Sequence, residues 1–107
     1  MNIKIQTVRF DADKNLLDLV EKKVGKLEKF YDRLIGAEVF LRLDNESSKI
    51  KDKVVEIRLI IPGNDLFSKE SSKSFEESVD MAVDSVLKQL KKHKEKTREE
   101  RVRKSEK

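Results

Sequence analysis

Two alternating stretches decide the fold of this 107-residue chain: AEVFLRLD at residues 37–44 and KVVEIRLII at residues 53–61. In each stretch every second side chain is apolar, which is the pattern of a strand with one face against a core. The short polar segment 45–49 between them predicts an antiparallel hairpin. The sequence PGND at residues 62–65 is a tight-turn signal, after which residues 66–72 predict a weaker fourth strand at the sheet edge.

The residues before this hairpin add a strand and a helix. Residues 2–10 alternate in the same way and predict a half-buried strand. From Lys14 to about Leu34 the apolar residues recur at helical spacing. Asp13 is placed to cap the start of this helix, and Gly36 is placed to end it.

A second helix is predicted after the hairpin. Ser74 and Glu77 form a capping box, and apolar side chains then recur at helical spacing as far as Leu90. The order β-α-β-β-β-α predicts an α+β fold in which both helices pack on one face of a four-stranded sheet. We assign residues 1–96 to this domain and residues 97–107 to a basic tail that is either a helical extension or disordered.

The composition excludes several classes of protein. The chain has no Cys and one His, which excludes disulfides, thiolate metal sites and multi-histidine metal sites. It contains no Gly-rich phosphate loop and no nucleophile motif, and Asp80 and Asp84 are best interpreted as solvated acids near a helix start. No apolar run approaches the ~20 residues of a membrane span, and the N-terminus is no signal peptide. We therefore expect a cytoplasmic protein with no membrane contact, no enzymatic activity, no cofactor or metal, and no small-molecule substrate.

The charge is unevenly distributed along the chain. The formal net charge is +4, but residues 88–107 hold ten basic and four acidic residues, so the rest of the chain is slightly acidic. A local basic excess of this kind indicates a polyanionic partner, although the helix dipole also favours cations at a helix C-terminus.

The predicted helices each carry a row of basic residues. The first row consists of Lys22, Lys26, Lys29 and Arg33, and the second of Lys88, Lys92 and Lys96. The first row contains no acid and lies opposite the apolar stripe of its helix. Two such rows side by side could bind phosphates, with each lysine ammonium group acting as a point charge. Because the aromatic residues fall mostly at core spacing, we expect binding through cations with little reading of bases.

Two segments resemble a known family. GKLEKFYDRL at residues 25–34 and KQLKKHKEK at residues 88–96 resemble the helical signatures of the hibernation-promoting factors, the ribosome-associated inhibitor or protein Y family, also called sigma-54 modulation proteins. The resemblance covers about residues 1–96 and indicates a short-form member, monomeric in isolation. It implies binding of the small ribosomal subunit and its rRNA at the decoding region, over the tRNA A and P sites and the mRNA path. Translation in idle ribosomes would then be blocked by steric exclusion.

The predicted rRNA contacts combine the family's basic positions with the two rows. They are Lys22, Lys23, Lys26, Lys29, Arg33, Lys88, Lys91, Lys92, Lys94 and Lys96. Two other classes remain open at this point: a generic module for double-stranded RNA, and a protein-interaction module that uses the charged second helix.

Overall fold

The computed structural model describes residues 1–44 and 52–105, with side chains as far as residue 96. Its elements are β1 (Asn2–Val8), α1 (Lys14–Gly25), the 3-10 helix η1 (Lys26–Lys29), β2 (Gly36–Asp44), β3 (Asp52–Ile61), β4 (Asn64–Ser72) and α2 (Phe75–Ser105). The predicted order β-α-β-β-β-α is confirmed, with strand ends within one or two residues of the predicted ones. The predicted connection at residues 45–49 lies outside the described residues.

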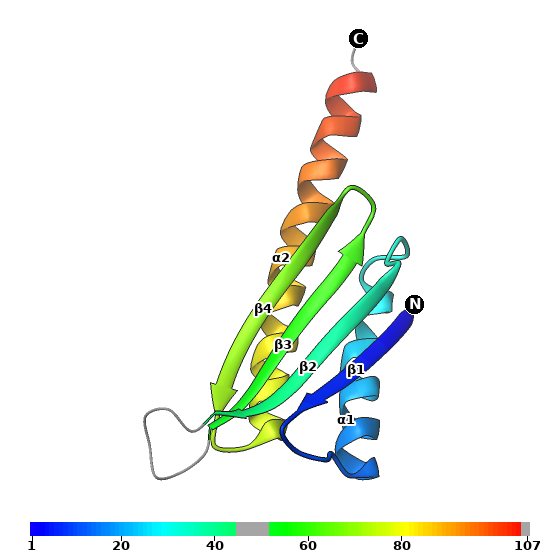
Figure 1. Ribbon diagram of the computed structural model, residues 1–107. Coiled ribbons are helices and arrows are strands. Elements are labelled where there is room, and N and C mark those ends of the chain that lie inside the picture. The colour runs from blue at the N-terminus through cyan, green and yellow to red at the C-terminus, as the bar shows by residue number, and fades with distance from the viewer. Residues whose placement is uncertain (45–51, 106–107) are drawn as a thin grey trace.

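The four strands form one sheet in the order β1-β2-β3-β4. β1 runs parallel to β2, and the other neighbouring pairs are antiparallel, as the alternation predicts for β2 and β3. Figure 1 shows both helices on the same face of this sheet, so the predicted two-layer α+β architecture is confirmed. β4 lies at the edge of the sheet, as predicted.

The hydrophobic core lies between the sheet and the two helices. The inward faces of β2 and β3 contribute fully buried side chains such as Val39 and Ile57, which are paired across the two strands. Val24 from α1 and Leu90 from α2 are buried against them. Burial of each such aliphatic side chain stabilises the fold by roughly 1.5–3 kcal/mol, and this fixes the two helices relative to the sheet.

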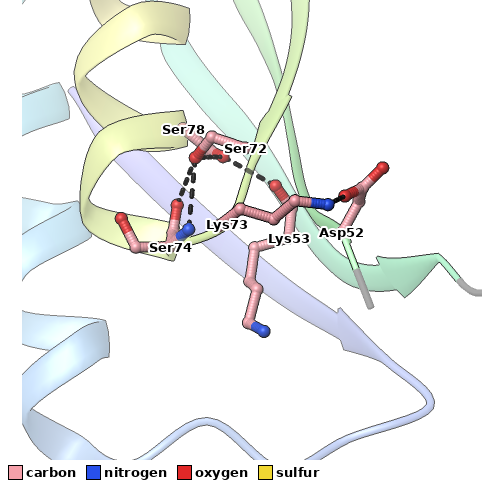
Figure 2. A network of polar contacts seen from close by, with 6 residues as sticks. All are labelled: Asp52, Lys53, Ser72, Lys73, Ser74 and Ser78. Carbon is pink, nitrogen blue, oxygen red and sulfur yellow. Dashed lines mark hydrogen bonds and ion pairs between the residues drawn. The ribbon is translucent and has the colours of Figure 1, made fainter. Parts of the chain in front are cut away.

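The start of α2 is tied to the sheet by serine hydroxyls (Figure 2). Ser74 Oγ accepts a hydrogen bond from the Glu77 N–H at 3.1 Å, as the predicted cap requires. Ser78 is fully buried and donates to the carbonyl oxygen of Lys53 at 2.6 Å, and its hydroxyl lies 2.8 Å from that of Ser72. Asp13 caps α1 as predicted, accepting from the Leu16 N–H at 2.8 Å.

The outer edge of β4 contacts α2 through a side-chain amide. Gln89 Nε2 donates to the carbonyl oxygen of Phe67 at 2.7 Å, and the Phe67 N–H donates to Gln89 Oε1 at 3.4 Å. Farther along the chain, α2 extends past the end of the sheet where β3 turns into β4 (Figure 1). The helical backbone continues through Ser105, and the division into a domain and a tail at residue 96 stays a prediction.

The predicted end of the first helix is wrong. α1 ends at Gly25 and the chain continues as the 3-10 helix η1 through Lys29, instead of reaching Leu34 as an α-helix. Since β2 already begins at Gly36, a helix to Leu34 would leave one residue to reverse the chain direction. The turn after η1 nevertheless buries Leu34, which explains why the apolar spacing continues to look helical.

Gly36 is the first residue of β2 and does not end a helix. A Cβ atom at this position would lie 2.9 Å from the backbone carbonyl oxygen of Asn2, so the missing side chain lets β1 approach. We expect Gly36→Ala to lower the free energy of unfolding by about 1–3 kcal/mol in chemical denaturation. Gly25→Ala is the matched control, because a Cβ there meets nothing within 4 Å. In helical backbone that change should stabilise by about 0.4–1 kcal/mol, and equal effects of the two substitutions would contradict the close approach.

Candidate nucleic-acid interface

A shallow open groove lies between α2 and the segment formed by the end of α1 and η1. Its volume is about 190 Å³. The lining residues are Lys23, Lys26, Leu27, Phe30, Asp80, Val83 and Leu87. Val83 and Leu87 supply partly exposed apolar surface above the buried Leu27, whereas Lys23 and Lys26 place cations at the margin. The groove therefore combines an apolar floor with charged walls.

The 3-10 helix positions two of the predicted contacts. Leu27 is 1% exposed and anchors η1 to the core, which leaves Lys26 and Lys29 exposed. In a 3-10 helix the side chains at i and i+3 eclipse, so these two lysines lie one above the other. Lys22 is exposed on the last turn of α1, directly before them. Arg33 is also exposed, but it lies in the turn after η1, so its predicted place in the helical row is wrong.

A short segment of α2 docks on the end of η1. Lys94 Nζ donates to the carbonyl oxygen of Phe30 at 3.2 Å, and Lys91 Nζ lies 5.3 Å from the centroid of the Phe30 ring. One residue farther along, Tyr31 and His93 meet edge to face, with ring centroids 5.9 Å apart. Lys91 and Lys94 are therefore brought beside the end of η1 although they are about sixty residues away in sequence.

Two of the predicted contacts form ion pairs within the protein. Lys23 pairs with Asp80 across the two helices, and Lys88 Nζ lies 3.2 Å from Asp84 Oδ2 within α2. Asp80 and Asp84 are exposed, as predicted, and each in addition pairs with a lysine. Exposed pairs of this kind contribute about 0–1 kcal/mol, so an incoming phosphate can replace the carboxylate at low cost.

The other predicted contacts in the described region are exposed cations. Of the predicted contacts, those that are exposed and have no carboxylate in ion-pair range are Lys22, Lys26, Lys29, Arg33, Lys91, Lys92, Lys94 and Lys96. Elsewhere in the described residues the same is true of Lys4, Arg9 and Lys14. Lys88 and Lys92 lie on the side of α2 opposite the buried Val86 and Leu90, away from the groove. The structure thus gathers Lys23, Lys26, Lys91 and Lys94 around one groove, and spreads the rest over the outer helix surface.

The exposed face of the sheet is charged in a different way. Arg42 and Glu56 on neighbouring strands form an ion pair, with 2.9 Å between the guanidinium nitrogen and the carboxylate oxygen. The Arg58 guanidinium hydrogen-bonds to Asp65, and this bond together with the charges of Asp65 and Glu38 raises the pKa of Arg58. Arg42 and Arg58 therefore have acidic partners, although Lys4 on the same face has none. The helix layer, formed by α1, η1 and α2, carries more cations without an acidic partner and is the better surface for a polyanion.

Phe30 is the residue that the sequence analysis missed. The aromatic residues, Phe30 among them, were expected mostly at core spacing, yet 39% of Phe30 is exposed at the groove. A signal was present, since Leu27, Tyr31 and Leu34 complete the apolar stripe without it. Phe67 is likewise 51% exposed, on the opposite face of the sheet, whereas Phe10 and Phe75 stack at 4.9 Å against the core.

Neither a metal-binding cluster nor a membrane-spanning helix is found among the described residues. No set of three or more His, Asp or Glu side chains in this part of the chain is arranged to hold a metal ion. Over the same residues, no helix combines the length and the apolar character needed to cross a membrane. What the surface offers is ammonium groups around an apolar groove, a combination suited to phosphates and flat apolar rings.

The sequence of this chain is similar to that of a known protein family and of several curated proteins. Residues 3–98 match the family described as Sigma 54 modulation protein / S30EA ribosomal protein. The chain is 29% identical over 96 residues to the ribosome hibernation promoting factor of Azotobacter vinelandii, covering 90% of this chain and 85% of that protein. It is 31% identical over 98 residues to the ribosome hibernation promotion factor of Bacillus subtilis, covering 90% of this chain but 50% of that longer protein.

Solved structures agree with this match. The N-terminal domain of protein Y from Thermus thermophilus superposes with a TM-score of 0.75 at 28% identity, covering 87% of this chain and 99% of that one. A ribosomal subunit interface protein from Coxiella burnetii has the same fold, with a TM-score of 0.78 at 22% identity over 88% of this chain and 98% of that one. The chain belongs to the Sigma 54 modulation protein / S30EA ribosomal protein family.

Proposed function

We propose that this protein is a cytoplasmic ribosome hibernation factor, which binds the small ribosomal subunit at the decoding region and blocks translation in idle ribosomes. Its curated relatives are ribosome hibernation promoting factors, and it shares the fold of a subunit interface protein. The observation that carries the proposal is the segregation of charge. Most of the exposed cations without an acidic partner lie on the helix layer, whereas Arg42 and Arg58 of the sheet face are paired with acids and Lys4 on that face is not.

The proposed mechanism is steric and requires no chemical step. The sheet and core hold η1 and α2 at a fixed spacing, so their lysines meet rRNA phosphates as a preformed set. Each contact releases counterions from the RNA, which supplies affinity. The body of the domain then occupies the tRNA A and P sites and the mRNA path.

The ion pairs within the helix layer fit this mechanism. Lys23 is held toward α2 by Asp80, and Lys88 is held by Asp84. On the ribosome, phosphates would replace these carboxylates, so both lysines would be positioned before binding and available during it. The weakness of exposed ion pairs makes this exchange inexpensive in free energy.

Competition on the small subunit tests the proposal. We expect the protein to co-sediment with vacant small subunits and to be excluded from subunits loaded with mRNA and tRNA. If six or more phosphates are contacted, affinity should fall by about 10³-fold or more between roughly 50 and 200 mM salt. Equal binding to vacant and loaded subunits would refute the proposed location. Equally tight binding to free duplex RNA would instead assign a generic duplex-RNA module, and salt-independent binding would assign a protein-interaction module.

A further inference from the structure

The aromatic ring of Phe30 occupies an unusual position for a phenylalanine. It is 39% exposed, it lines the groove between η1 and α2, and an ammonium group lies 5.3 Å from its centroid. An aromatic ring that served only the core would be turned inward, as the stacked rings of Phe10 and Phe75 are. The chain instead leaves the helix at this residue and presents the ring at the groove.

The surroundings of the ring match the two halves of a nucleotide. Val83 and Leu87, which are partly buried, supply apolar surface that suits a planar base. Lys26 lies at the same groove, and Lys91 and Lys94 contact Phe30 from α2, so ammonium groups flank the position on both sides. A flat apolar surface beside several cations is the arrangement by which proteins bind unpaired nucleotides.

We propose that Phe30 is a stacking platform for one unpaired base of the bound RNA, with Lys26 and Lys91 on the adjacent phosphates. This inference rests on the proposed function and deepens it, because it adds a contact to a base where the other contacts are to phosphates. It differs from the expectation that binding involves little contact with bases, which stays a prediction.

In the free protein Lys91 covers part of the ring, and RNA would displace it. An exposed cation–π contact favours its bound state by a factor of about 2–5, whereas a base stacked on an aromatic ring contributes a factor of roughly 5–150. Stacking therefore wins the competition, and the released ammonium group gains a phosphate partner.

Substitution of the ring provides the first test. We expect Phe30→Leu to weaken binding to small ribosomal subunits by about 5- to 100-fold, with the slope of affinity against salt unchanged because no cation is removed. Phe30→Tyr keeps a ring and should retain the affinity. Phe67→Leu is the matched control, since Phe67 is also exposed but lies on the opposite face of the sheet. Equal affinities of the Phe30→Leu and Phe30→Tyr variants would overturn the inference, provided that their thermal unfolding midpoints agree.

Fluorescence provides a second test that does not need ribosomes. The chain contains no Trp, so Phe30→Trp introduces a single indole at the groove. We expect a single-stranded oligoadenylate to quench its emission at low salt, and inorganic polyphosphate, which has the charge but no base, to leave it unchanged. Quenching by both polyanions, or by neither, would overturn the platform.

The two tests also separate this inference from the proposed function. If the unmodified protein fails to co-sediment with small subunits, the proposed function fails, and the oligoadenylate titration still decides whether Phe30 stacks on bases. If the unmodified protein binds subunits and Phe30→Leu binds equally well, the platform is wrong and the proposed function stands.

Discussion

Replacing four helix-layer lysines by glutamate is expected to abolish co-sedimentation of the protein with small ribosomal subunits. The variant carries Lys26→Glu, Lys29→Glu, Lys88→Glu and Lys92→Glu. All four side chains are exposed and outside the core, so the fold should persist. The sign of the formal net charge, which is +4 in the natural chain, is reversed. We expect affinity at physiological salt to fall by a factor on the order of 10² or more, because four phosphate contacts become repulsive.

The salt dependence shows whether those lysines act at phosphates. Neutralising the same four positions with glutamine should reduce the magnitude of the slope of log affinity against log salt by about 3–4. Two double variants with the same change in net charge provide a control. One carries Lys26→Glu and Lys29→Glu, and the other carries Lys4→Glu and Lys69→Glu, at positions on the outer face of the sheet. Only the first pair should weaken binding. A folded quadruple variant that still co-sediments at physiological salt would show that the helix layer is not the interface.

The largest expected effect on stability comes from Leu27→Ala. Leu27 is 1% exposed and is the buried side chain of η1. Truncating a buried leucine costs roughly 2–5 kcal/mol, since apolar contacts are lost and a cavity is left. We expect the midpoint of urea unfolding to fall by the corresponding amount, with the slope of the transition unchanged.

Ile35→Ala is the control for this substitution. Ile35 is an aliphatic residue in the turn that follows η1, but it is 56% exposed, so its truncation should change the free energy of unfolding by no more than about 0.5 kcal/mol. A cost for Leu27→Ala as small as that of Ile35→Ala would show that η1 is not anchored through this side chain.

The strands could be predicted from the sequence because the alternation of apolar and polar residues in a strand shows directly which of its faces is buried. Alternation in β2 and β3 follows directly from one buried and one exposed sheet face, and this relation depends on no distant residue. The helix cap at Asp13 and the turn at Gly63 also depend only on neighbouring residues, and the structure contains both. Gly63 has a φ of 76°, which favours glycine.

The end of the first helix could not be predicted in this way. Leu27 and Leu34 are both buried, and their separation is compatible with an α-helix. Whether the chain between them is helical depends on where β2 must begin, and this is set by the parallel pairing of Asn2 with Gly36. Local periodicity contains no information on that long-range constraint.

The candidate site was predicted in outline but not in its arrangement. The row Lys88, Lys92 and Lys96 follows from helical spacing, whereas the first row leaves the α-helix at Gly25. The pairing of Lys23 with Asp80 and the contact of Lys94 with Phe30 depend on how two helical segments meet. Phe30 was misassigned for the same reason, because its exposure depends on the change from α-helix to 3-10 helix beside it.

The amide of Gln89 gives the edge of the sheet a further property. By donating to the Phe67 carbonyl and accepting from the Phe67 N–H, it repeats the pair of bonds that a residue of a neighbouring antiparallel strand would make. An uncovered strand edge is a template on which other chains can add, and the outermost positions of β4 are where such growth would begin. One side chain from α2 therefore satisfies the outward N–H and C=O of Phe67, at one position of the β4 edge, as a residue of a fifth strand would.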